Sequence, residues 1–132
     1  MRKFIFILLM IGQTTQAQEL MTAEQLIDRS TQPEMAIPVA MYISGWRDGV
    51  SAGLLQAAEA LREVGGINAE YEAARSGCIG GLGVADLIAK LREMQGDADS
   101  GEKQEAANVV LLNGATQICE KSIDEALAGN SN

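Results

Sequence analysis

The sequence predicts an all-α fold, a small single-domain helical bundle of four to five helices with one disulfide. Alanine, leucine, glutamate and glutamine are abundant in the chain, and these residues are good helix formers. No stretch of strand length alternates apolar and polar residues, whereas longer stretches repeat apolar residues at steps of three and four. Two cysteines, Cys78 and Cys119, can supply the disulfide.

Residues 1–17 have the organisation of a cleavable export signal. Arg2 and Lys3 precede an unbroken run of eight apolar residues, Phe4 to Ile11, and Thr15-Gln16-Ala17 gives the small-x-small pattern of a cleavage site. A membrane span needs about 20 apolar residues, so we expect cleavage after Ala17 rather than a retained anchor. The alternative is a short buried N-terminal helix.

Residues 18–132 are expected to form one acidic domain. Loss of Arg2 and Lys3 leaves 8 basic against 18 acidic residues, a net charge of −10. Such a chain repels nucleic acid and anionic lipid, so we expect neither nucleic-acid binding nor membrane association after cleavage. The charge suits a basic protein partner, although solubility alone also explains it.

Cys78 and Cys119 predict one disulfide, because an even pair of cysteines in an oxidising compartment is normally bonded. The bond would close a loop of about 41 residues. By restricting the unfolded chain, it would raise the free energy of unfolding by roughly 4 kcal/mol. Two buried free thiols are the alternative.

Two helices are expected before residue 65. Thr22-x-x-Gln25 is a capping-box pattern that opens a helix over about 23–29. Pro38 is placed to begin the second helix, which runs to about Arg62 and is stopped by Gly65-Gly66. The apolar stripe of this second helix consists of Val39, Ile43, Trp46, Val50, Leu54, Ala57 and Leu61.

The second half of the chain contains two further predicted helices. Residues 67–77 fit one or two helical turns or an ordered loop, and 77–83 fits a glycine-rich turn that holds Cys78. A third helix is expected over 84–95, and the last over about 102–127. The apolar residues of these two helices are Val84, Leu87, Ile88, Leu91, Ala107, Val110, Leu111, Gly114, Ala115 and Ile118.

The residue inventory argues against an enzyme. Without histidine the chain lacks Ser-His-Asp and Cys-His catalysis and histidine-ligated zinc, and two cysteines are too few for a thiolate metal site. The glycine-rich segment lacks the order that cradles phosphates. Carboxylate pairs such as Glu70 and Glu72 fit a solvated surface better than glycosidase chemistry. We therefore expect no catalytic residues, cofactor or metal.

The acidic segment 96–101 begins like a calcium loop but does not complete one. Asp97 and Asp99 have the right spacing, yet Gly101 stands at the fifth position and Asn108 at the twelfth. Three polar residues of this segment and the adjoining Glu102 are instead predicted to contact a protein partner, with a solvated turn as the alternative: Asp97, Asp99, Ser100 and Glu102.

Gly45 and Gly49 are the most unusual local feature of the chain. Each glycine inside a helix costs about 1 kcal/mol relative to alanine. Both are therefore predicted to permit a close helix approach, either within the fold or across a dimer. The neighbouring Trp46 lies on the apolar stripe, and we interpret it as a core residue rather than a partner contact.

Three motifs together resemble the type VI secretion amidase-immunity (Tai-like) family. They are Tyr42-Ile43-x-Gly45-x-x-Asp48-Gly49 in a long helix, then Cys78-Ile79 followed by Gly83-Val84, and a last helix that ends at Cys119. The resemblance spans roughly residues 36–119. Gly80 and Ile118 stand where the family pattern has proline.

The resemblance implies a periplasmic protein that neutralises an injected cell-wall hydrolase. Members are helical and often dimeric, and they occlude the active-site cleft of their toxin, so we expect a cognate hydrolase as partner and a homodimer. One alternative is a small periplasmic stress chaperone or binding module. Another is an accessory subunit of an envelope machine.

Overall fold

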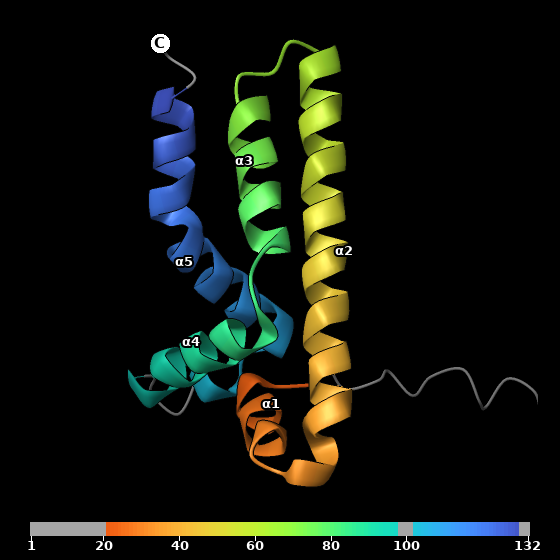
Figure 1. The fold of residues 1–132 in the computed structure, drawn as a ribbon, viewed down its shortest axis with the longest axis vertical. Coiled ribbons are helices and arrows are strands. Elements are labelled where there is room, and N and C mark those ends of the chain that lie inside the picture. Colours follow the sequence, from red (N-terminus) through yellow and green to blue (C-terminus); the bar gives the residue numbers. More distant parts are fainter. Residues whose placement is uncertain (1–20, 98–101, 130–132) are drawn as a thin grey trace, which may run out of the picture.

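A computed structural model describes residues 21–97 and 102–129, with only the backbone described at Asp97 and Glu102. It confirms the all-α prediction, since the described residues form five α-helices and two short 3-10 helices and contain no strand (Figure 1). The elements are α1 (Ala23–Ser30), η2 (Pro33–Met35), α2 (Ala36–Glu63), α3 (Ala69–Gly80), α4 (Val84–Asp97), η3 (Glu102–Gln104) and α5 (Ala107–Gly129).

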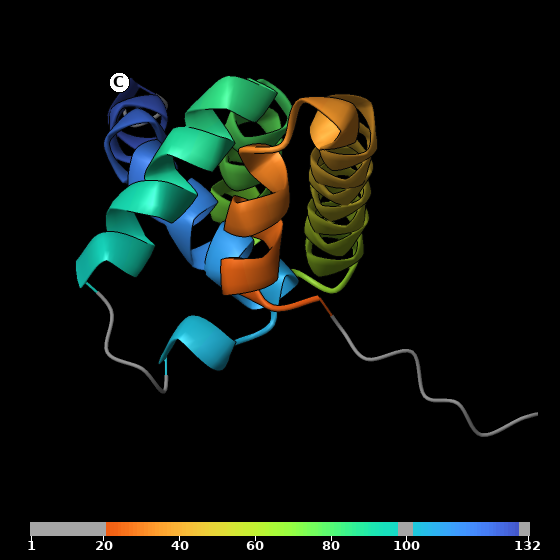
Figure 2. The same ribbon diagram turned by 90° about the horizontal axis from the view of Figure 1, so that it is seen from below.

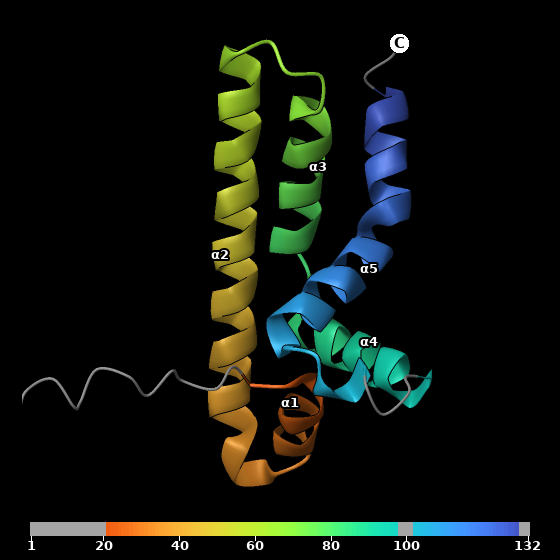
Figure 3. The same cartoon turned by 180° about the vertical axis from the view of Figure 1, so that it is seen from behind.

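Helix α3 lies between α2 and α5. α2 and α3 form an antiparallel hairpin with the most extensive contact of any helix pair, and α5 packs on the other side of α3 (Figures 1 and 3). α4 crosses the lower part of α5, and α1 packs against α2, α4 and α5 at the same end (Figure 2). The hairpin turn between α2 and α3 therefore projects from the opposite end.

The core follows the predicted stripes with two departures. Its members are Ala23, Leu26, Val39, Ile43, Ile79, Leu87, Leu91, Ala107, Val110, Leu111, Ala115, Cys119 and Ile123. Ile118, expected in the buried stripe of the last helix, is only half-buried and lies outside the core, and the stripe of α2 shifts by one residue near its end. Ala57 was expected in the stripe of α2 but is exposed, and Ala58 is buried instead. That half of α2 faces α3 through Ser51, and Ala58 follows Ser51 by two helical turns, so it points toward the same neighbour.

The start of α1 is joined to the start of α5. The predicted capping box is present, since the Gln25 N–H donates to the Thr22 hydroxyl and the Thr22 N–H donates to the Gln25 side chain. The Ala23 N–H donates to the Glu105 carbonyl (2.9 Å), and the Ala107 N–H donates to the Met21 carbonyl (2.8 Å). The segment that precedes each helix thus supplies a carbonyl to the first N–H of the other helix, which no intrahelical carbonyl can reach. We call this pair of bonds the terminal clasp.

The clasp explains one wrong boundary. The last helix was expected to begin at Glu102, but η3 occupies that position and α5 begins only at Ala107, because the intervening residues pair with Met21 and Ala23. α4 extends to Asp97, two residues beyond the predicted end.

The second helix also begins earlier than predicted. α2 starts at Ala36 rather than at Pro38, and η2 leads into it from Pro33. Pro38 is the third residue of α2, where a backbone N–H would have no intrahelical acceptor, so the missing donor costs nothing there.

The glycine-rich turn predicted over 77–83 is wrong in its first half. α3 runs from Ala69 to Gly80, so Cys78 is helical and the turn is restricted to Gly81–Gly83. The Cys78–Cys119 disulfide is confirmed, with a Cα–Cα distance of 5.9 Å. It joins α3 to α5, not the entrance of α4 to α5. One turn earlier in each helix, Arg75 donates to the Thr116 hydroxyl at 2.9 Å.

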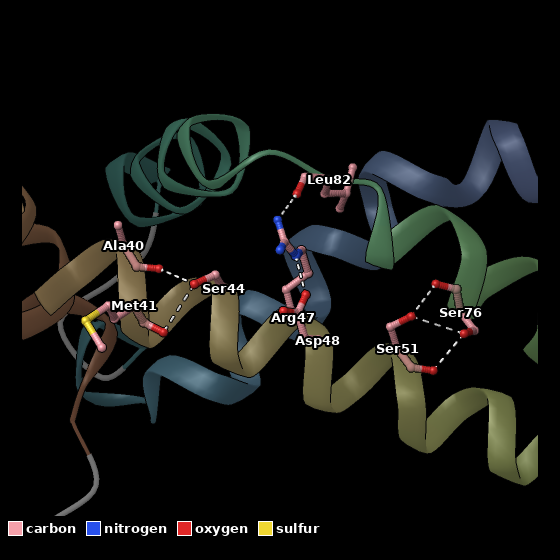
Figure 4. Close-up of polar contacts among 8 residues, drawn as sticks. All are labelled: Ala40, Met41, Ser44, Arg47, Asp48, Ser51, Ser76 and Leu82. Atoms are coloured by element: carbon pink, nitrogen blue, oxygen red, sulfur yellow. Dashed lines mark hydrogen bonds and ion pairs between the residues drawn. The ribbon is translucent and has the colours of Figure 1, made fainter. Parts of the chain in front are cut away.

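On its other side, α3 approaches α2 closely at Gly80. The Ser51 hydroxyl donates to the Ser76 carbonyl (2.9 Å), and the Ser76 hydroxyl donates to the Ser51 carbonyl (2.7 Å; Figure 4). A Cβ at Gly80 would lie 2.7 Å from Ser51 Oγ and 3.3 Å from Ser51 Cβ. Glycine is therefore required at position 80 by the serine pair.

Gly80→Ala is expected to destabilise the protein by about 1–3 kcal/mol, because the new methyl group must displace a hydroxyl held by hydrogen bonds. Gly77→Ala is the matched control in the same helix. Its Cβ would meet nothing within 4 Å, so it should stabilise by up to about 1 kcal/mol. Urea unfolding followed by circular dichroism measures both. Equal effects of the two substitutions would contradict the close approach.

Loss of the disulfide in Cys78→Ala/Cys119→Ala is expected to lower the free energy of unfolding by about 2–5 kcal/mol, since the bond restricts the unfolded chain. The same measurement on the reduced wild type supplies the control. A double variant as stable as the oxidised wild type would show that packing alone holds α3 against α5.

Candidate functional site

The predicted contact segment falls mainly outside the described residues. Asp99 and Ser100 belong to 98–101, while Asp97 ends α4 and Glu102 begins η3. The structure thus brings the two ends of the segment to the base of the molecule and leaves its contact role a prediction.

An open hollow of about 330 Å³ lies beside these ends, lined by Glu24, Ile27, Arg92, Gln95, Gly96 and Lys103. Gln95 is 8% exposed, and its buried Oε1 has no hydrogen-bond partner. Arg92 donates to the Ser30 hydroxyl at 3.0 Å. The hollow offers polar contacts but no nucleophile beside a base. Within 21–97 and 102–129, no group of three or more acidic or cysteine side chains could hold a metal.

Gly45 and Gly49 do not mediate a close approach within the described fold. A Cβ at either position would meet nothing within 4 Å, and both residues are exposed. Sequence reasoning missed the close approach at Gly80, described above. Gly114, which the sequence places in the stripe of the last helix, is buried as expected, and its Cβ would lie 3.1 Å from Met94 Sδ. A close approach at Gly45 and Gly49 between the α2 helices of two copies therefore stays a prediction.

The exposed side of α2 around these glycines is apolar and nearly neutral. We define the α2 outer face as Ile37, Met41, Gly45, Gly49 and Leu55, in which Ile37 is 73% and Met41 69% exposed. The charges within this stretch are Arg47 and Asp48, which pair with each other at 2.8 Å. Arg47 also donates to the Leu82 carbonyl at 3.1 Å, so it is directed toward the turn before α4 (Figure 4).

A second exposed apolar group lies at the turn between α2 and α3. We define the hairpin tip as Val64, Gly65, Gly66 and Ile67, of which Val64 is 81% and Ile67 96% exposed. The turn projects from the end of the molecule opposite α1 and α4 (Figure 1). Sequence reasoning missed this group because Gly65-Gly66 was interpreted only as a helix stop. The available signal was two large apolar residues beside the glycines and outside every apolar stripe.

The aromatic residues of α2 pack against the core. Trp46 and Tyr42 are partly buried against it, which agrees with the core interpretation of Trp46. Burial raises the pKa of the Tyr42 hydroxyl above its ordinary value of 10.0. The folded state thus favours the neutral hydroxyl, and this contribution to stability is present below pH 10 and lost as the pH rises through the folded pKa.

No family model, curated protein or solved structure matches the chain. The family resemblance therefore rests on the residues quoted above. Among the described residues, no helix combines the length and apolar character that crossing a membrane requires.

Proposed function

We propose that this protein is a periplasmic immunity protein that binds a peptidoglycan-degrading, amidase-type effector and occludes its active site. The observation that carries the proposal is the placement of exposed apolar side chains. Ile37, Met41, Val64 and Ile67 lie on the outside of a helical scaffold stapled by a disulfide, and not in a cavity. Exposed apolar groups on a rigid scaffold are typical of binding to another protein.

Three further features support this proposal. A leader over residues 1–17 would deliver the chain to an oxidising compartment, where Cys78 and Cys119 can bond. A net charge of −10 after Ala17 would favour association with a basic enzyme. The acidic segment with Asp97, Asp99, Ser100 and Glu102 is proposed as a contact with that enzyme.

The α2 outer face is proposed as the contact between two copies of the chain. Two acidic copies repel each other, so self-association favours a surface where charge is low. This face meets that condition, because Arg47 and Asp48 neutralise each other. Gly45 and Gly49 would let two α2 helices approach closely.

A stress-chaperone function is the second candidate, favoured by the same exposed apolar residues on an acidic chain. Protonation of the carboxylates would remove the negative charge around these exposed residues and leave them free to contact unfolded clients. Suppression of aggregation by the purified protein at about pH 2–3 is the observation that would select it.

The immunity function is tested by producing the hydrolase encoded by the neighbouring gene in the periplasm of a bacterial host. Growth should be restored when the full chain is co-produced, because the two proteins meet in the same compartment. A variant that lacks residues 2–17 should accumulate without protecting. The proposal fails if the exported protein gives no protection, or if the neighbouring product does not degrade peptidoglycan.

Gly45→Ala/Gly49→Ala tests the dimer contact. Nothing within the described fold obstructs either methyl group, so the free energy of unfolding should rise by up to about 1 kcal/mol per glycine. Between two copies the methyl groups would hold the helices apart, at a cost of about 1–3 kcal/mol, which raises the dimer dissociation constant about fivefold to a hundredfold. Sedimentation equilibrium measures that constant.

Gly77→Ala, the control used above for Gly80, also serves for the glycine pair. Gly77 is exposed with nothing within 4 Å of its Cβ, but it belongs to α3 and not to the α2 outer face. It should stabilise the chain without changing the dimer. Unchanged self-association in the Gly45/Gly49 double variant would remove this face from the interface.

A further inference from the structure

Val64 and Ile67 at the hairpin tip have no role in stabilising the fold. They are the two most exposed large apolar side chains of the described residues, at 81% and 96%. Full burial of such a side chain stabilises a protein by about 1.5–3 kcal/mol relative to exposure. Val64 and Ile67 make no such contribution, because both stay in water. A partner that covers them would gain this free energy.

The backbone of the tip is fixed by contacts of its own. The Gly66 N–H donates to the Leu61 carbonyl at 2.6 Å, and Gly65 has a φ of 70°, which favours glycine. A Cβ at Gly66 would lie 2.8 Å from Leu61 Cδ2, so only glycine fits beside that side chain. An ion pair between Arg62 and Glu70 (3.1 Å) joins the two sides of the hairpin. Binding would therefore order little additional backbone.

Acidic side chains surround the apolar tip. Glu59 and Glu63 are exposed at the end of α2, and Glu70 is exposed at the start of α3. The one cation between Glu59 and Glu70, Arg62, is already paired with Glu70. A second copy would bring the same negative charges and be repelled. The complementary occupant is a protein concavity with an apolar floor and lysine or arginine at its rim.

We propose that the hairpin tip is the element that enters the cleft of the target enzyme, with Val64 and Ile67 on its apolar floor and Glu63 facing its basic rim. This inference rests on the proposed function, because it assigns the cleft to the cell-wall hydrolase. The tip suits a narrow cleft, since its two central residues carry no side chain. It lies at the opposite end of the molecule from the ends of α4 and η3 (Figures 1 and 3), so its contribution can be separated from that of residues 97–102.

Ile67→Glu tests the tip, with the purified hydrolase of the neighbouring gene as the probe. A carboxylate on an apolar floor should raise the dissociation constant at least a hundredfold and abolish inhibition of peptidoglycan cleavage at concentrations where the wild type inhibits. Titration calorimetry and release of soluble fragments from sacculi measure the two effects. The thermal midpoint should not change, because the side chain is almost fully exposed.

Gln117→Glu is the control, because it adds the same carboxylate on the exposed side of α5, outside the hairpin tip, the α2 outer face and residues 97–102. It should leave the affinity for the hydrolase unchanged. Glu63→Lys should slow association several-fold, and this effect should diminish at high salt.

The outcomes separate the two proposals. If the wild type binds the hydrolase and Ile67→Glu binds equally well, the tip is not the contact, while the immunity function stands. If Ile67→Glu instead dissociates a dimer in sedimentation equilibrium, the tip joins two copies and the inference is wrong. If the wild type neither binds nor inhibits the hydrolase, both proposals fall.

Discussion

The close contact between α2 and α3 is the constraint on which the other helices depend. Ser51 and Ser76 exchange hydrogen bonds, and this exchange requires that Gly80 carry no side chain. Two residues after Ser76, Cys78 bonds α3 to α5 from the other side. α3 is thus fixed to α2 and to α5 within five residues. α4 and α1 then pack against α2 and α5, whose relative position this arrangement sets.

Much of the fold could be predicted because its signals are local. The Thr22–Gln25 capping box, the apolar repeats and the two cysteines each depend on residues close in sequence or on simple pairing. The errors arose where a distant segment decided the outcome. Gly77 and Gly80 continue a helix that glycine propensity alone would end, because α2 supports it. α5 begins late because residues 105–107 bond to Met21 and Ala23.

The candidate site was less accessible from the sequence, for a related physical reason. Gly45 and Gly49 attract notice as glycines in a helix, yet nothing within the described fold approaches them. Val64 and Ile67 attract less notice, since their one sequence signal is that they lie beside two glycines and outside every apolar stripe. Only the arrangement of α2 and α3 shows that both point into solvent at the end of a hairpin. Whether an apolar residue is buried depends on its neighbours in space, which no spacing rule supplies.

The terminal clasp has a consequence for the order in which the chain can fold. A chain that leaves the ribosome with its N-terminus first presents Met21 and Ala23 early, but Glu105 and Ala107, which bond to them, arrive almost last. Until then α1 lacks the backbone bonds and the α5 contacts that hold it. α1 can therefore dock only when nearly the whole chain has been made, whereas α2 and α3 can pair as soon as residue 80 has emerged, because their contacts do not involve the clasp. The first helix of the chain is thus among the last to find its place.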